Sequence, residues 1–239
     1  MKTIKELKIK LFADGADLKE MTDLYKSGLV KGFTTNPSLM RKAGVKDYES
    51  FAKEVLKAIS DLPISFEVFS DEFNQMEREA LKIKSWGSNI YVKIPITNTK
   101  GESSVPLIKK LVSQGLALNV TAILLTEQVK AVVDVLNPEI PSIVSVFAGR
   151  IADTGRDPIP HMKDCAEICA KNPRAELLWA SSRELLNVFH AEESGCHIIT
   201  ATPDILKKIK NIGRDLKEYS LDTVITFYKD AQAAGYKII

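Results

Sequence analysis

Short apolar runs rich in β-branched residues alternate along this chain with longer segments whose apolar positions recur at helical spacing. The short runs predict buried strands, and the longer segments predict amphipathic helices. The predicted strands are Ile9–Ala13, Gly32–Thr34, Ile64–Phe69, Ile90–Ile94, Ala117–Thr121, Ile143–Phe147, Glu176–Ala180 and His197–Thr200. The main predicted helices are Tyr48–Ile59, Asn74–Ser85, Ser103–Gln114, Glu127–Leu136, Ile159–Ala170 and Ser182–Ser194.

This alternation of strands and helices over 239 residues favours an α/β fold, a single (β/α)8 TIM barrel. A doubly wound open sheet is the alternative architecture. Against it, no Gly-x-Gly-x-x-Gly motif follows a predicted strand, and the chain has no Gly-x-x-x-x-Gly-Lys-Ser/Thr phosphate loop. Because no linker rich in Gly, Pro or Ser interrupts the pattern, we expect one domain over residues 1–239. Residues 221–239 form its C-terminal helical tail, with a helix over Thr223–Ala234.

The charge balance adds no sign of a nucleic-acid or membrane partner. The 33 basic and 31 acidic side chains leave a net charge of +2, and the lysines are scattered rather than gathered with aromatic residues. No apolar run approaches the length of a membrane span, and no signal peptide follows the first residues. We therefore expect a cytoplasmic protein that binds neither nucleic acid nor membrane.

The three cysteines, Cys165, Cys169 and Cys196, do not form a disulfide framework. Their spacing is unsuited to a structural zinc site, and the three histidines do not complete one. We expect three reduced thiols, in keeping with the cytosol, and no metal.

One cationic side chain, Lys93, interrupts the apolar run Asn89–Ile96. An ammonium group surrounded by hydrocarbon is costly, and it usually persists by losing its proton. A neutral, desolvated lysine is the nucleophile that forms Schiff bases with carbonyl substrates. The alternative is that Lys93 reaches solvent at the strand end or pairs with a carboxylate.

Polar residues follow most of the predicted strands, at the end of a TIM barrel where active sites lie. These are Asp14, Thr35 with Asn36, Glu67, Lys93, Asn119 with Thr121, Ser145 with Arg150, and Ser181 with Arg183. Each has a structural alternative: Asp14 as a helix cap, the segment Thr35–Ser38 as a turn and helix start, and the arginines as surface ion pairs. Together, polar groups that converge on a buried lysine indicate an active site.

These residue types suit Schiff-base chemistry on a polyhydroxylated anion. Glu67 is the acid/base partner that a carbinolamine needs to lose water, and Thr121 would hold the water that moves the proton. Asp14 would exchange a proton with a sugar hydroxyl. Hydroxyl groups of the substrate would be held by Asn36, Asn119 and Ser145. Guanidinium groups suit phosphate oxygens, so the predicted anion site is Arg150, Ser181 and Arg183.

The same residues carry a resemblance to the transaldolase family, in particular to the small bacterial transaldolases and the related fructose-6-phosphate aldolases. The resemblance runs in order from residue 9 to about residue 206. Its segments are Ala13–Asp17, Gly32–Ser38 with Thr-Thr-Asn-Pro-Ser, Tyr91–Thr97 with Val-Lys-Ile-Pro, Asn119–Thr121, Ser145–Ile151 and Ala180–Arg183.

The resemblance implies a (β/α)8 barrel with the Schiff-base lysine, here Lys93, on the fourth strand. It implies cleavage of a ketose phosphate between C3 and C4 and transfer of the dihydroxyacetone unit to an aldose phosphate, without a metal or organic cofactor. Asp14 would be the base for the C4 hydroxyl, while Glu67 and Thr121 would bind the catalytic water. The substrate-binding set would be Thr35, Asn36, Asn119, Ser145, Phe147, Arg150, Ser181 and Arg183. Small members of this family form ring assemblies, so we expect a homo-oligomer.

Two positions bear on the branch of the family. The family's aldolases carry Gln at the position of Glu67 and Tyr at that of Phe147, where a hydroxyl helps organise the water that hydrolyses the intermediate. Phenylalanine cannot donate a hydrogen bond, so the pair favours a transaldolase over an aldolase that uses water as acceptor. A third interpretation, a barrel that binds sugar phosphate without catalysis, would require Lys93, Glu67 or Asp14 to be missing, and none is.

The chain also departs from the family pattern. Ser182 stands where long transaldolases have an aromatic residue, and the segment 153–161 carries an extra arginine, Arg156, and a histidine, His161. An alternative hypothesis is therefore that the donor is a modified ketose, such as a sulfonated one, bound at the same anion site.

Overall fold

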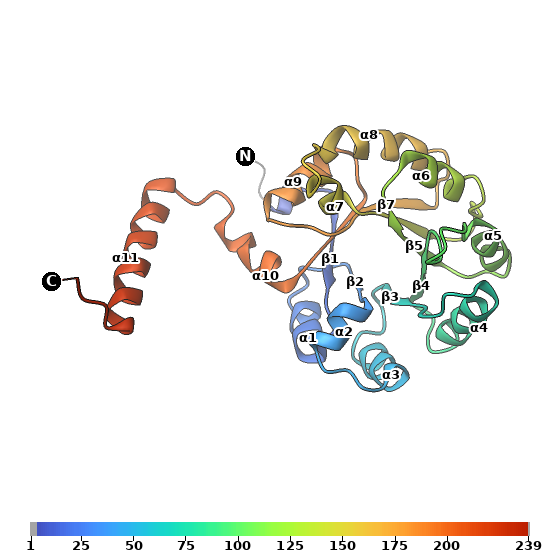
Figure 1. The fold of residues 1–239 in the computed structure, drawn as a ribbon, viewed down its shortest axis with the longest axis horizontal. Helices are drawn as coiled ribbons and strands as arrows, with labels where there is room; N and C mark the ends of the chain where they lie inside the picture. Colours follow the sequence, from blue (N-terminus) through green and yellow to red (C-terminus); the bar gives the residue numbers. More distant parts are fainter. Residues whose placement is uncertain (1–3, 239) are drawn as a thin grey trace. The chain divides into compact units, whose positions relative to one another are not determined.

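The computed structural model describes residues 4–238, and its main unit is a closed barrel of eight parallel strands in sequence order (Figure 1). The strands are β1 (Lys10–Asp14), β2 (Gly32–Thr34), β3 (Ile64–Glu67), β4 (Ile90–Pro95), β5 (Leu118–Ile123), β6 (Ser142–Val146), β7 (Ala175–Trp179) and β8 (Ile198–Ala201). Strand β8 pairs with β1, which closes the sheet. The predicted (β/α)8 fold is thus confirmed, and the open sheet is excluded.

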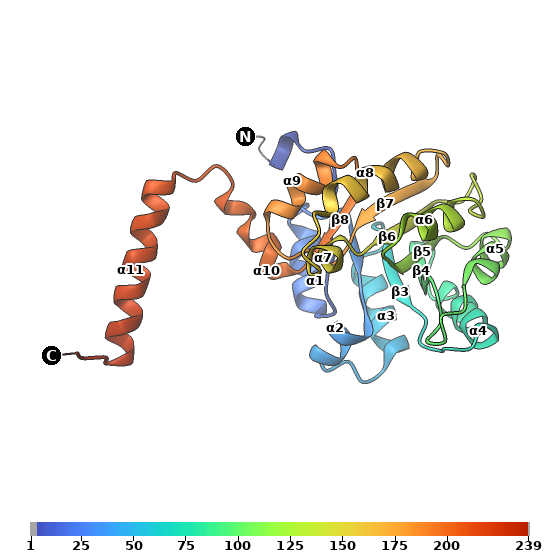
Figure 2. The ribbon, with the colours of Figure 1, turned by 45° about the horizontal axis from the view of Figure 1, so that its top comes forward.

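Helices surround the strands, as expected for a chain in which parallel strands are joined by crossovers (Figures 1 and 2). They are α1 (Leu18–Lys26), α2 (Pro37–Lys42), α3 (Tyr48–Ala58), α4 (Phe73–Lys84), α5 (Val105–Ser113), α6 (Thr126–Val133), α7 (Ala148–Ala152), α8 (Pro158–Cys169), α9 (Leu186–Glu193) and α10 (Pro203–Leu206). The short helices α2 and α7 were not among the predicted elements, because six and five residues are too few to establish a helical period.

The barrel interior is filled by apolar side chains from several strands. Phe12, Ile143, Leu178, Ala180 and Ile198 form one buried cluster, against which two partly buried aromatic residues pack. A filled barrel core leaves room for substrate only above it, where the strands end. The core therefore sets the floor of the site.

Some predicted boundaries differ from the observed ones. Strand β3 stops at Glu67 rather than Phe69, which is 51% exposed and donates its backbone N–H to Glu79. Helix α9 begins at Leu186 rather than Ser182, because the side chain of Asn187 accepts the backbone N–H of Arg183 and holds a turn there.

A second compact unit comprises Met1–Leu7 and Lys208–Ile239. Its main element is α11 (Leu216–Ala234), which starts earlier than the predicted Thr223 because Asp215 caps it through the N–H groups of Lys217 and Glu218. The helix ends at Gly235, which adopts a left-handed φ of 69°. The terminal unit also contains the 3₁₀ helix η1 (Ile4–Glu6), and η2 (Lys207–Asn211) spans its boundary with the barrel.

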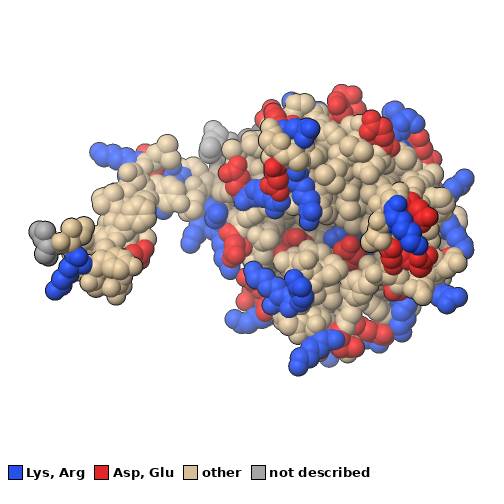
Figure 3. Space-filling view, in the orientation of Figure 1, with Lys and Arg blue, Asp and Glu red and all other residues tan. Residues whose placement is uncertain are grey.

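The remaining sequence expectations concern absences. All three cysteines are free and buried. In the part of the chain that the structure describes, no helix is long and apolar enough to cross a membrane, and no cluster of potential ligands would hold a metal ion. Basic and acidic side chains alternate over the visible face of the barrel (Figure 3).

Candidate active site

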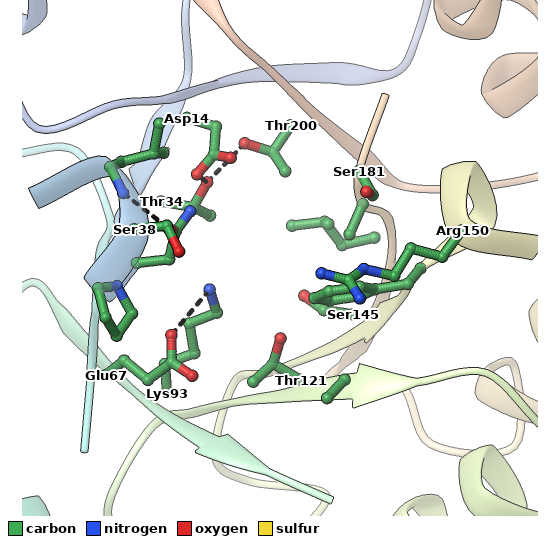
Figure 4. A pocket seen from close by; sticks show the side chains of 17 residues that line it. Asp14, Thr34, Ser38, Glu67, Lys93, Thr121, Ser145, Arg150, Ser181 and Thr200 are labelled. Carbon is green, nitrogen blue, oxygen red and sulfur yellow. Dashed lines mark hydrogen bonds and ion pairs between the residues drawn. The ribbon is translucent and has the colours of Figure 1, made fainter. Parts of the chain in front are cut away.

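A cavity of about 440 Å³ opens where the barrel strands end. Most of the predicted site residues surround it (Figure 4). Nine of the twelve line it: Asp14, Asn36, Glu67, Lys93, Thr121, Ser145, Phe147, Arg150 and Ser181. The other three, Thr35, Asn119 and Arg183, do not line it. Thr35 and Asn119 are hydrogen-bonded to the lining residues Lys93 and Ser145, whereas Arg183 pairs with Asp153.

Lys93 lies on β4 directly beside Glu67 on β3, because the two residues are register partners. The side chain of Lys93 is only 9% exposed. Its Nζ lies 3.3 Å from Oε2 of Glu67 and donates a 3.0 Å hydrogen bond to the carbonyl oxygen of Thr35. The predicted pairing alternative is therefore realised, and the same pairing puts a carboxylate beside a buried amine.

Asp14 ends strand β1 and borders the cavity. Burial raises the pKa of its carboxyl group, while the charge of Lys93 and hydrogen bonds from Thr34 and Asn36 oppose that rise. The Oγ1 of Thr34 donates to Oδ1 of Asp14 at 2.8 Å. Asp14 is not a helix cap: Asp17 caps α1 instead, through the N–H of Glu20.

Asn36 combines both interpretations given to it. Its Oδ1 accepts the backbone N–H of Leu39 at 3.0 Å and caps α2, whose first residue is Pro37. The same side chain hydrogen-bonds to Asp14. The cap therefore fixes the amide at the edge of the cavity.

Asn119 lies beneath the floor of the cavity and is fully buried. It donates to Oγ of Ser65 at 2.9 Å and accepts from Oγ of Ser145 at 2.7 Å. Asn119 thus holds Ser145 in place, since Ser145 itself lines the cavity.

Thr121 presents an unused hydroxyl to the cavity. Its Oγ1 is buried and has no hydrogen-bond partner among the described residues (Figure 4). The backbone beside it is irregular, because the β5–β6 register shifts after Val120 and Ala122 takes a φ of 61°. A buried polar atom without a partner is costly, so this hydroxyl is placed to bind water or a substrate oxygen.

The opposite wall comes from α7 and the end of β7. Arg150 lines the cavity, with its guanidinium carbon 5.6 Å from the ring centre of Phe147. Ser181 has a φ of 65°, a conformation that costs a non-glycine residue on the order of 1–3 kcal/mol. A Cβ on Gly149 would lie 1.7 Å from the carbonyl oxygen of Ser181, so only glycine lets α7 approach this strained turn.

Arg183 forms a surface ion pair, which was the structural alternative given for it. Its guanidinium makes a two-pronged ion pair with Asp153, at the end of α7, and the side chain is 47% exposed. That pairing holds the pKa of Asp153 below its ordinary value, with a further contribution from Arg150. Arg156 and His161, the additional residues of this segment, do not line the cavity.

The sequence prediction missed three polar residues that line the cavity: Thr34, Ser38 and Thr200. Thr34 and Thr200 end or nearly end strands β2 and β8. The rule that selected the other strand ends would have found Thr200, had the eighth strand been treated like the rest. After the second strand, the rule selected Thr35 and Asn36 and passed over Thr34, its last residue.

The relatives of this chain match it over most of its length. The family model described as "Transaldolase/Fructose-6-phosphate aldolase" matches residues 11–238. A protein of Brucella ovis named "Probable transaldolase" is 34% identical over 234 residues, 96% of this chain and 100% of the relative. A "Probable transaldolase" of Nitrosopumilus maritimus is 32% identical over 203 residues, 84% of this chain and 87% of the relative.

Solved structures support the fold alone. That of KGPDC from Streptococcus mutans superposes with a TM-score of 0.56 at 12% identity, over 84% of this chain and 91% of that one. The sequence match therefore assigns the family. This chain belongs to the transaldolase/fructose-6-phosphate aldolase family of enzymes.

Proposed function

We propose that this protein is a Schiff-base transaldolase. It would transfer a dihydroxyacetone unit from a ketose phosphate, such as fructose 6-phosphate or sedoheptulose 7-phosphate, to an aldose phosphate. The observation that carries the proposal is the environment of Lys93: a side chain 9% exposed, facing a cavity, with Nζ 3.3 Å from a carboxylate. A buried amine with a carboxylate at this distance suits nucleophilic attack on a carbonyl group.

Schiff-base formation requires proton transfers at two atoms, the nitrogen of Lys93 and the hydroxyl oxygen of the carbinolamine. Lys93 would first give a proton to Glu67, and the resulting amine would add to the C2 carbonyl of the ketose. The carbinolamine formed in this step must then lose its hydroxyl group as water. Glu67 is the group within reach to move these protons, directly or through one water. The free hydroxyl of Thr121 would hold that water.

Carbon–carbon cleavage would then use Asp14 on the other side of Lys93. Asp14 removes the proton of the C4 hydroxyl, the C3–C4 bond breaks, and its electron pair moves into the protonated imine. An aldose phosphate leaves, and the three-carbon unit stays bound to Lys93 as an enamine. Addition of this enamine to a second aldose reverses the same steps. No cofactor is required, because the iminium group accepts the electrons.

The anionic group of the substrate would bind at the opposite wall. Arg150 and Ser181 line the cavity there, while Arg183 is paired with Asp153. We expect Arg150 to contact the anion first, and Arg183 to join it only by exchanging Asp153 for the ligand. A guanidinium group serves phosphate and sulfonate oxygens alike, so a sulfonated ketose is the alternative donor.

Water as the final acceptor is the second candidate activity. It is disfavoured by Phe147, which lines the cavity but offers no hydroxyl to orient a hydrolytic water. The enamine would therefore persist on Lys93 until an aldose acceptor binds. Turnover of fructose 6-phosphate that proceeds at full rate without an aldose acceptor would favour the aldolase.

The terminal unit supports a homo-oligomer. Helix α11 exposes large apolar side chains, which are Leu216, Tyr219, Leu221, Val224, Ile225, Phe227 and Tyr228. A helix with so much exposed apolar surface is typical of a surface that binds another subunit. Light scattering after size-exclusion chromatography would give the mass of the assembly. A monomer at micromolar concentration would refute this part of the proposal.

We also expect a cytoplasmic enzyme that acts on sugar phosphates in pentose phosphate and related carbohydrate metabolism.

The decisive experiment is borohydride reduction of the protein with fructose 6-phosphate, followed by intact-mass and peptide mass spectrometry. We expect a three-carbon adduct on Lys93, which requires both Schiff-base formation and bond cleavage. No adduct with fructose 6-phosphate, but one with free dihydroxyacetone, would indicate a different donor. No adduct with either compound would refute the proposed chemistry.

A further inference from the structure

Two threonine hydroxyls beside Asp14 form a chain that the proposed mechanism does not use. The Oγ1 of Thr34 donates to Oδ1 of Asp14 at 2.8 Å, and the Oγ1 atoms of Thr34 and Thr200 are 2.6 Å apart (Figure 4). Thr34 is 2% exposed and Thr200 is 6% exposed. Because both side chains are buried from solvent, each hydroxyl group depends on neighbouring protein groups for its hydrogen bonds.

Three adjacent strands build this chain. Asp14 on β1 is the register partner of Thr34 on β2, and Thr200 on β8 is the register partner of Phe12, two residues before Asp14. Residues two apart on a strand face the same side, so all three side chains point into the barrel mouth. The barrel closure between β8 and β1 thus brings the third group to the first two.

The number of hydrogen atoms determines which group donates in each hydrogen bond of this threonine chain. Each hydroxyl carries one hydrogen, so when Thr34 donates to an ionised Asp14, the hydrogen between the two threonines must come from Thr200. When Asp14 is protonated on Oδ1, the direction reverses: Asp14 donates to Thr34 and Thr34 donates to Thr200. The hydroxyl of Thr200 then turns toward the cavity, which this residue lines.

We propose that Thr34 and Thr200 are positioning residues that hold the Asp14 carboxylate and follow its protonation by turning their hydroxyls together. The inference rests on the proposed function, in which Asp14 removes the C4 hydroxyl proton. In that step the sugar O–H bond breaks and an O–H bond forms on Asp14. The electron pair left on the sugar oxygen becomes the new carbonyl bond as C3–C4 breaks. Each threonine keeps its own hydrogen, and no net proton leaves the site.

A separate hydrogen bond links the backbone of Thr200 to the opposite wall of the cavity. The carbonyl oxygen of Thr200 accepts a 2.7 Å hydrogen bond from Oγ of Ser182, which directly follows Ser181. Ser182 is one of the positions where this sequence departs from the family pattern. Ser182 therefore anchors the strand that carries Thr200. An aromatic side chain is too large to place a hydroxyl group at the same position.

Burial is the main cause that raises the pKa of Asp14, and few charges act on its ionisation. Lys93 on β4 is the charged group that lowers the Asp14 pKa, and Glu67 on β3 faces Lys93 in turn. The other charged residues that line this cavity or the adjoining one are Arg150 on α7, Asp17 before α1, Glu20 on α1, Lys42 on α2 and Asp204 on α10. Thr200 does not touch the carboxylate: when Asp14 is ionised, the Thr200 hydroxyl donates to Thr34 and so strengthens the hydrogen bond that Thr34 donates to Asp14. Weakening that bond removes stabilisation of the ionised carboxylate, so the loss of the Thr200 hydroxyl should raise the Asp14 pKa.

The test compares Thr200→Val, which removes the hydroxyl but keeps the shape, with Thr200→Ser, which keeps the hydroxyl. The readout is the pH dependence of kcat/KM for the donor, which reports the free enzyme. Because Asp14 must be ionised to act as a base, we expect the acid limb of Thr200→Val to move up by about one pH unit. Thr200→Ser should restore the wild-type profile.

Thr202→Val is the matched control, because Thr202 lies two residues further on and makes no side-chain hydrogen bond at its helix start. Its profile should match the wild type. Should Thr200→Val not fold, Thr200→Ala removes the same hydroxyl without a new branch and is expected to show the same shift.

Borohydride trapping of dihydroxyacetone on Lys93 separates this proposal from the one on which it rests, since trapping does not need Asp14 to break a bond. An adduct in every variant together with an unshifted acid limb in Thr200→Val and Thr200→Ala would overturn the threonine chain alone. Absence of the adduct in the wild type would overturn the proposed function, and the chain would lose its role with it.

Discussion

The two walls of the barrel mouth are built in opposite ways. The lysine wall, formed by Asp14, Thr34, Glu67, Lys93 and Thr200, is largely buried and joined by hydrogen bonds and an ion pair between strands. The arginine wall, formed by Phe147, Arg150 and Ser181, lies on a short helix and a strained turn, with Arg150 open to solvent.

This difference matches the role that we propose for each wall. Proton transfers and covalent attack require groups held within a fraction of an ångström, which packed strands provide. Binding a remote anion tolerates motion, and it gains from groups that exchange partners as Arg183 can with Asp153. We therefore expect substitutions on the lysine wall to lower kcat, and those on the arginine wall to raise KM.

The largest expected effect is that of Lys93→Met. Methionine keeps an unbranched apolar stem in a buried strand, so the barrel should fold, while loss of the amine should reduce turnover at least about a thousandfold. Lys109→Met, on the exposed face of α5, is the control. Steady-state kinetics and circular dichroism measure both properties. A Lys93→Met enzyme that keeps wild-type turnover would contradict the mechanism.

Gly149→Ala should disrupt the arginine wall and leave the lysine wall intact. The new methyl group would overlap the Ser181 carbonyl at 1.7 Å, so either α7 or the strained turn must shift. We expect donor KM to rise about tenfold or more, with a stability loss of about 1–3 kcal/mol. Borohydride trapping of free dihydroxyacetone, which has no anionic group, should persist. Gly87→Ala serves as the control, because its neighbour is the flexible end of Leu56 at 3.3 Å.

Arg150→Ala and Arg183→Ala rank the two guanidinium groups. Arg150 lines the cavity and Arg183 is paired with Asp153, so Arg150→Ala should raise donor KM more than Arg183→Ala does. Neither should change kcat greatly, because the anion does not react. Asp153→Asn should release Arg183 and lower KM by a few fold. Equal effects of the two arginine substitutions would mean that the ion pair opens before the substrate binds.

Phe147→Tyr tests the choice of acceptor, with the smallest structural change. A hydroxyl at this position offers a hydrogen bond to water, so we expect release of free dihydroxyacetone from fructose 6-phosphate to increase several-fold while the transfer reaction persists. A coupled assay for dihydroxyacetone, run with and without an aldose phosphate, distinguishes the two outcomes. An unchanged ratio of release to transfer would remove Phe147 from the argument about the acceptor.

The sequence by itself determined the strands, their order and much of the lysine wall. Buried strands are short and apolar, so a single lysine in the run around Lys93 is conspicuous, and the rule that barrel chemistry lies at strand ends selected Asp14, Glu67 and Thr121. Adjacent parallel strands then placed Glu67 beside Lys93 without any long-range information.

Only the tertiary structure decided the partners. Thr200 is more than 160 residues from Thr34 in sequence, and it reaches that residue because β8 closes on β1. Asn119 does not line the cavity, because Ser145 on the neighbouring strand lies above Asn119 and lines the cavity instead. The partner of Arg183 depended on where α7 ends. Side-chain contacts between distant segments depend on how the barrel closes and how loops pack, and a local pattern of polar and apolar residues does not encode them.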